Sequence, residues 1–171
     1  MSSFPAAEKI ARMKNPLDWT PEKSQLMVEA LREFATFHYE HSQEIRFLYD
    51  RRGFKPSDLK SERDIENIPS IGVTAMKYFL MTSLPSEKAV LKLTSSGTRG
   101  QKTQIWFDEQ SLSRVQSMLD VLWEQEGLSN DIPTNYVNFI YDPEEAKDLG
   151  VSFSVKNEQR FSPPLESYFT V

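Results

Sequence analysis

The chain has 171 residues, of which 20 are Lys or Arg and 25 are Asp or Glu, giving a formal charge of −5. This length suits one domain with a sizeable core, and the 39% hydrophobic content is typical of a globular protein. The acidic balance argues against nucleic acid as a partner, because binding along its phosphates needs a positive surface. Cysteine is absent, which excludes disulfides, thiolate metal sites and a cysteine nucleophile within these residues. No apolar run is long enough to cross a bilayer and the polar start lacks a signal-peptide core, so we expect a cytoplasmic protein without a membrane span.

The strongest periodic signal in the chain predicts one long helix from residue 21 to about residue 50. Thr20 is suited to cap its start, with Pro21 at the first helical position. Gly53 is suited to end it, after two arginines. Apolar and histidine side chains recur at steps of three and four along one face. They are Met27, Leu31, Phe34, His38, His41, Ile45 and Leu48.

His38 and His41 lie three residues apart on this face, a spacing that could place both on one metal ion. Both fall on the apolar stripe without a completing acidic ligand on it. We therefore interpret them as partly buried, hydrogen-bonded histidines and predict no metal site.

Two short helices are predicted next, one capped by Ser57 and ending near Pro69, the other starting at Thr74 and reaching Met81. The pattern then changes to alternating strands and helices. Strands are predicted at 90–94, 103–107 and 136–141, and Asp108 is suited to cap a helix with apolar positions at Leu112 and Val115. The last thirty or so residues are weakly patterned. The aromatic side chains of this half could line a ligand pocket, but at strand and helix spacing we interpret them as core. The fold class is therefore α/β, with a helical N-terminal region at 1–85 and an α/β region at 86–171.

One segment between two predicted strands differs in composition from the rest of the chain. Residues 93–103 contain five hydroxyl residues, two glycines and two cations. Backbone N–H groups, hydroxyls and cations all donate to phosphate oxygens, and glycine lets the backbone approach them closely. A polyphosphate is the ligand that suits such a loop, although a hairpin loop without a ligand has the same composition. The P-loop pattern G-x-x-x-x-G-K-[ST] is not met, because Gly97 and Gly100 are too close together.

The segment Thr94-Ser95-Ser96-Gly97-Thr98-Arg99-Gly100 resembles the T-S-[SG]-G-T-T-G phosphate loop of acyl-adenylate-forming enzymes. It lies in a wider order of segments, 65–69, 76–80 and 103–108, that resembles the acyl-protein synthetase family. This family is also called LuxE, or long-chain-fatty-acid–luciferin-component ligase. Phenylacetate–coenzyme A ligases share the same layout.

The resemblance implies an enzyme that uses ATP and Mg²⁺ to activate a fatty or other carboxylate as an acyl-adenylate and passes the acyl group to a thiol. It also implies an acyl-acceptor or reductase protein as a partner. The residues expected to contact the β- and γ-phosphates are Thr94, Ser95, Ser96, Gly97, Thr98 and Gly100. Two cations, Arg99 and Lys102, are also expected to bind the phosphates, although both differ from the family pattern. Arg99 replaces a threonine and Lys102 replaces a proline found in many members.

Other parts of such a ligase have no counterpart in this sequence. The family's adenine-binding and hinge segments, its catalytic lysine and its acyl-carrying cysteine are not found here. Catalytic residues therefore stay unknown, and the sequence is interpreted as the N-terminal part of an acyl-protein synthetase. Two alternatives remain open. One is a non-catalytic relative that binds a partner through the amphipathic helix at 21–52, and the other is a fragment of a phenylacetate–coenzyme A ligase-like enzyme.

Overall fold

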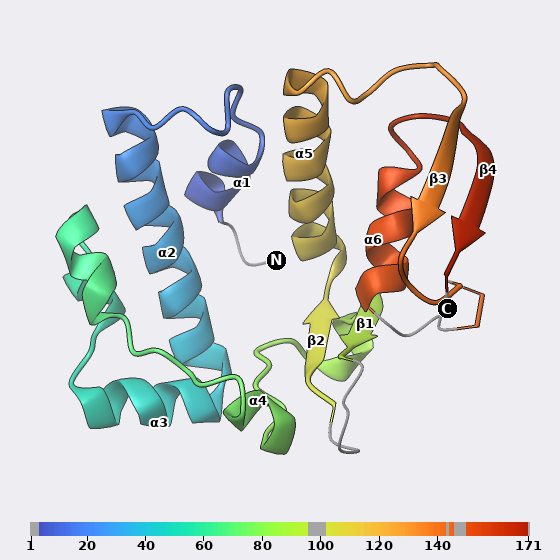
Figure 1. Ribbon diagram of the computed structural model, residues 1–171. Helices are drawn as coiled ribbons and strands as arrows, with labels where there is room; N and C mark the ends of the chain where they lie inside the picture. Colours follow the sequence, from blue (N-terminus) through green and yellow to red (C-terminus); the bar gives the residue numbers. More distant parts are fainter. Residues whose placement is uncertain (1–3, 96–101, 143, 146–149, 171) are drawn as a thin grey trace.

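The computed structural model describes residues 4–95, 102–142, 144–145 and 150–170. Its α-helices are α1 (Pro5–Ala11), α2 (Pro21–His41), α3 (Gln43–Arg52), α4 (Ala75–Tyr78), α5 (Glu109–Gln125) and α6 (Gly150–Glu158). Short 3-10 helices cover Pro56–Asp58, Glu62–Asn67 and Ser86–Lys88. The strands are β1 (Leu91–Thr94), β2 (Gln104–Phe107), β3 (Thr134–Asn138) and β4 (Pro164–Phe169). Helices thus occupy the first part of the chain and a mixture of helices and strands the second (Figure 1), which confirms the α/β fold class.

The single long helix predicted from residue 21 to residue 50 is wrong, because the chain breaks at Ser42. This residue is extended, with φ −122° and ψ 121°, and its N–H donates to the carbonyl of His38 at the end of α2. Its side chain then accepts a hydrogen bond from the N–H of Ile45 at 3.4 Å, which starts α3. The apolar periodicity continues across the break because Leu31 of α2 and Ile45 and Leu48 of α3 pack in the same cluster.

The helical region has two apolar clusters. The first joins α2, α3 and the loop after them, and its buried members are Val28, Ala35, Ile45, Tyr49, Phe54 and Leu59. The second joins α1 to α2, where the ring of Phe4 lies 5.2 Å from that of Phe34 and 5.3 Å from that of Phe37. Gly53 ends α3 in the left-handed conformation with φ +66°, which confirms the predicted cap.

The segment from residue 56 to residue 81 differs from the prediction. Residues 57–68 form two separate 3-10 turns in place of one short helix, and Lys55 takes the cap position predicted for Ser57. Helix α4 ends at Tyr78, short of Met81. Both segments are short, so tertiary packing decides their conformation more than local propensity does.

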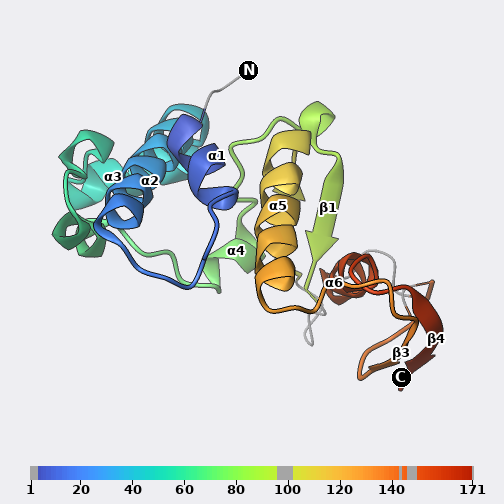
Figure 2. The ribbon, with the colours of Figure 1, turned by 90° about the horizontal axis from the view of Figure 1, so that it is seen from above.

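The second half of the chain contains two small sheets. Strands β1 and β2, which lie within the two strands predicted to flank the loop, pair antiparallel. Strands β3 and β4 pair parallel, and the weakly patterned end of the chain supplies both α6 and β4. Strand β3 begins two residues before the predicted one and ends at Asn138. Seen from above (Figure 2), α5 and β1 lie between the helical region and the group formed by β3, β4 and α6.

Candidate functional site

The hydroxyl- and glycine-rich segment connects β1 to β2. Thr94 is the last residue of β1 and pairs with Gln104, the first residue of β2. Beyond this pair, the N–H of Ser95 donates to the carbonyl of Thr103 at 3.0 Å, and the N–H of Thr103 donates to Ser95 Oγ at 3.0 Å. These two reciprocal bonds hold Ser95 and Thr103 together at the base of the loop.

The predicted phosphate-binding residues lie on and beyond this closure. Thr94 is half-buried at the strand end, and Ser95 and Lys102 are exposed on the two sides of the base. Ser96, Gly97, Thr98, Arg99 and Gly100 lie outside the described residues, so their contacts stay a prediction. Sequence reasoning missed the structural role of Ser95. Its oxygen accepts from the backbone while its hydroxyl proton remains able to donate to an anion.

A cross-strand pair supports the register of the hairpin. Lys92 on β1 pairs with Trp106 on β2, and its ammonium lies 4.2 Å from the centroid of the indole ring. The indole N–H donates to Gln104 Oε1 at 3.2 Å. The hairpin register, and with it the alignment of Ser95 with Thr103, therefore depends on side-chain contacts as well as on the ladder.

Helix α5 continues directly from β2. Asp108 caps it as predicted, since its carboxylate accepts from the N–H of Ser111 at 2.8 Å and its own N–H donates to Ser111 Oγ at 2.9 Å. Burial alone would raise the pKa of the Asp108 carboxyl. The hydrogen bonds from Ser111 and the positive charge of Arg114 outweigh burial, so its pKa lies below its ordinary value.

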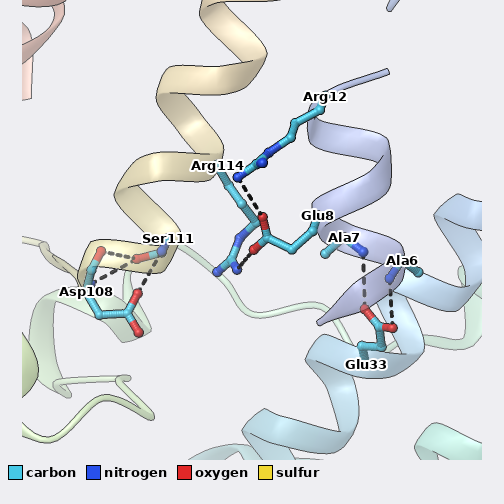
Figure 3. Close-up of polar contacts among 8 residues, drawn as sticks. All are labelled: Ala6, Ala7, Glu8, Arg12, Glu33, Asp108, Ser111 and Arg114. Carbon is cyan, nitrogen blue, oxygen red and sulfur yellow. Dashed lines mark hydrogen bonds and ion pairs between the residues drawn. The ribbon is translucent and has the colours of Figure 1, made fainter. Parts of the chain in front are cut away.

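A polar cluster joins α5 to the N-terminal helix (Figure 3), and no local sequence signal predicted it. Glu8 Oε1 on α1 lies 2.8 Å from Arg114 Nη1 on α5, across 106 residues of sequence. The other carboxylate oxygen of Glu8 lies 3.6 Å from Arg12. On the opposite side of α1, the carboxylate of Glu33 accepts from the N–H groups of Ala6 and Ala7 at 3.0 and 3.2 Å. Contacts between residues so far apart in sequence produce no periodic pattern in either helix, so the sequence could not predict them.

The two histidines of the apolar face are hydrogen-bonded, as predicted, but the prediction of partial burial is wrong, because both residues are exposed. His38 Nδ1 lies 2.8 Å from Ser83 Oγ, and His41 Nδ1 lies 2.8 Å from the carbonyl of Phe37. Desolvation by neighbouring atoms, with a smaller contribution from the charge of His41, holds the pKa of His38 below its ordinary value. Within the described ranges, no three His, Asp or Glu side chains are grouped closely enough to bind a metal ion.

The aromatic side chains of the second half do not gather into one pocket. Trp123 stacks on Phe161 with 4.9 Å between ring centroids, and the hydroxyl of Tyr136 donates to the carbonyl of Ser162. Phe139 lines a cavity of about 280 Å³ between β3 and α6 but is itself 81% exposed. In the part of the chain that the structure describes, no helix is both long and apolar enough to span a bilayer.

Solved structures with a similar fold are adenylate-forming ligases. An open conformation of 2-hydroxyisobutyryl-CoA ligase in complex with 2-HIB-AMP and CoA has a TM-score of 0.67 and 15% identity, over 94% of this chain and 36% of that one. The postadenylation state of the same ligase with 2-HIB-AMP has a TM-score of 0.63 and 15% identity, over 91% and 33%. The chain thus has the fold of part of an adenylate-forming ligase and spans about a third of the length of these structures.

The sequence assigns the chain to a particular family, which the shared fold alone does not. The sequence profile of the family described as "Acyl-protein synthetase, LuxE" matches residues 5–171. The chain therefore belongs to the acyl-protein synthetase family, as the phosphate-loop segment and its flanking order indicated. A comparison with curated protein sequences found no match.

Proposed function

We propose that this chain supplies the ATP-phosphate-binding part of an acyl-protein synthetase that activates a long-chain fatty carboxylate. One observation carries the proposal. A loop rich in hydroxyls, glycines and cations is closed at its base by Ser95 and Thr103, within a chain that matches the family over residues 5–171. The similar ligase structures add support, because they contain 2-HIB-AMP and, in the open conformation, CoA. These ligands fit an adenylate intermediate and a thiol acceptor.

The proposed reaction has two steps. A carboxylate oxygen attacks the α-phosphorus of ATP, and the bond from that phosphorus to the bridging oxygen breaks, releasing pyrophosphate. A thiol sulfur then attacks the acyl carbon of the adenylate, loses its proton and displaces AMP. This thiol is supplied from outside these 171 residues, which contain no cysteine. An acyl-acceptor or reductase protein is the proposed partner.

The loop stabilises the negative charge that moves onto pyrophosphate in the first step. Donors fixed in advance lower the barrier because they need no reorganisation as charge develops. The hydroxyls of Ser95 and Thr98 and the N–H groups of the glycines are the proposed donors, together with Thr94 and Ser96. Arg99 and Lys102 add positive charge. Mg²⁺ is bound mainly by the phosphate oxygens of ATP and by water, as is usual for this ion.

Carboxylate-dependent exchange between ATP and labelled pyrophosphate tests the proposal on the full-length product of the gene. Gly97→Val should abolish exchange, because a branched side chain at a glycine of a phosphate-binding turn keeps the backbone from the phosphates. Gly72→Val is the matched control, since Gly72 has open space around its Cα and no left-handed φ. Both variants should have the same urea unfolding midpoint as the wild-type protein. Exchange that survives Gly97→Val would contradict the assignment.

The choice of carboxylate separates the alternatives. Exchange with fatty acids supports the acyl-protein synthetase assignment, and exchange with phenylacetate alone supports a phenylacetate–coenzyme A ligase-like enzyme. No exchange with either by the full-length protein would favour the non-catalytic binding module.

A further inference from the structure

An ion pair withdrawn from solvent holds α5 against α1. The side chain of Arg114 is 12% exposed and that of Glu8 is 28% exposed, and their closest atoms are 2.8 Å apart. Solvent and salt screen such a pair much less than they screen a surface pair. The neighbouring pair between Lys9 and Glu22 gives the contrast, because its side chains are 59% and 61% exposed at a similar separation of 3.0 Å.

Arg114 also lies against two aromatic rings of the helical region. Its guanidinium carbon is 5.2 Å from the ring centroid of Phe4 and 5.4 Å from that of Phe34. Phe34 belongs to α2, and Phe4 immediately precedes α1. A planar guanidinium can stack on rings while it donates to a carboxylate. The side chain of Arg114 therefore contacts α1, the residue that precedes it, and α2.

The partner of Arg114 is itself fixed in place. Helix α1 is anchored at its first turn by Glu33 of α2, whose carboxylate accepts from two backbone N–H groups of α1 (Figure 3). This contact orients α1 and therefore the carboxylate of Glu8 that faces α5.

No residue of α5 is fully buried. The later part of the helix has its own contacts, because Asp120 pairs with Arg160 at 2.9 Å and Trp123 stacks on Phe161. The contact of Arg114 acts on the part of α5 nearer to β2.

Helix α5 is connected directly to the hairpin. Asp108 joins β2 to α5 without a loop, and its reciprocal bonds with Ser111 make the strand end and the first helical turn one rigid unit. Strand β2 begins next to Thr103, which closes the base of the loop with Ser95. The path from Glu8 to the loop base thus runs through Arg114, α5 and β2.

We propose that Arg114, held by Glu8, is a positioning residue that orients the β1–β2 hairpin for binding the phosphates of ATP. The N-terminal helical segment then acts on nucleotide affinity without touching the nucleotide. This inference rests on the proposed function, since it assumes that the loop binds ATP.

Glu8→Gln in the full-length protein is the test, because it removes the charge and keeps the size of the side chain. The KM for ATP in the exchange assay should rise about fivefold, the lower end of typical coupling between connected sites, with kcat nearly unchanged. Arg114→Lys is a second variant, which keeps the charge but loses the planar stacking, and it should raise KM as well. Glu22→Gln, which removes the exposed pair between α1 and α2, is the matched control and should leave KM unchanged.

A double variant and a direct measurement complete the design. If Glu8 and Arg114 act as one unit, Glu8→Gln combined with Arg114→Gln should raise KM no more than the larger of the two single changes, Glu8→Gln and Arg114→Gln. Amide hydrogen exchange at Ser95 and Thr103 should be faster in Glu8→Gln than in Glu22→Gln, with equal unfolding midpoints. An unchanged KM in Glu8→Gln beside an active wild-type protein would overturn the positioning role alone. A wild-type protein without carboxylate-dependent exchange would overturn the proposed function and this role with it.

Discussion

Replacing Leu59 by alanine tests the core that supports the helical region. The side chain of Leu59 is 0% exposed and lies among Val28, Ala35 and Tyr49 in the cluster that joins α2 to α3. Its carbonyl also accepts a hydrogen bond from Arg32 of α2 at 3.2 Å, which fixes the backbone of this loop whatever the side chain is. The substitution therefore removes buried methyl groups and leaves the backbone contact in place.

The expected loss of stability has two parts. Burying a whole leucine side chain is worth about 2 kcal/mol, and truncation loses most of this because the site is closed to water. The cavity left among side chains from separate elements adds a second part, and such substitutions lose about 3 to 4 kcal/mol in total. This is a large share of the roughly 5–15 kcal/mol by which a typical domain is stable.

Urea unfolding followed by circular dichroism measures the loss as a lower midpoint at an unchanged slope. Leu17→Ala is the matched control, because Leu17 is 68% exposed and its truncation should change stability by less than about 0.5 kcal/mol. A loss below about 1 kcal/mol for Leu59→Ala would refute the packing described for this cluster.

Two further predictions concern helix ends. Gly53→Ala should lower the free energy of unfolding by about 1 kcal/mol, because Gly53 has φ +66° although no atom lies within 4 Å of an added Cβ. Gly72→Ala, in equally open space without a left-handed φ, should be neutral or slightly stabilising, and equal losses at both glycines would contradict a backbone origin. Asp108→Asn keeps the capping hydrogen bond but removes the charge at the N-terminus of α5 and should lower stability near pH 7 by about 0.5–1 kcal/mol. Because the folded-state pKa of Asp108 lies below its ordinary 3.8, its contribution is present above that pH and is lost as the pH falls through the folded pKa. The difference between the wild type and Asp108→Asn should therefore shrink in unfolding titrations below about pH 4, and a constant difference would argue against the charge.

Much of the local structure could be predicted because its determinants are adjacent in sequence. Thr20 and Asp108 start helices, and Gly53 ends one, since a side-chain oxygen or a left-handed backbone satisfies groups only a few residues away. The strands flanking the loop were predicted from short β-rich runs of adjacent residues. The residues of the phosphate site stay a prediction from that motif.

The errors occurred where distant parts of the chain decide the outcome. Ser42 interrupts a continuous apolar period, because the core that α2 and α3 share stabilises a bend that the period cannot show. The parallel pairing of β3 with β4 joins two segments whose own patterns are weak.

The sequence by itself determined the family of this protein, because short motifs and their order identify it. The same motifs carry the prediction that the candidate loop binds phosphate. Only the tertiary structure decided that Ser95 and Thr103 close the loop base and that Glu8 holds Arg114 on α5. A periodic or capping signal reports contacts within a few residues. A contact across 106 residues depends on how every intervening element packs, so it leaves no mark at either end.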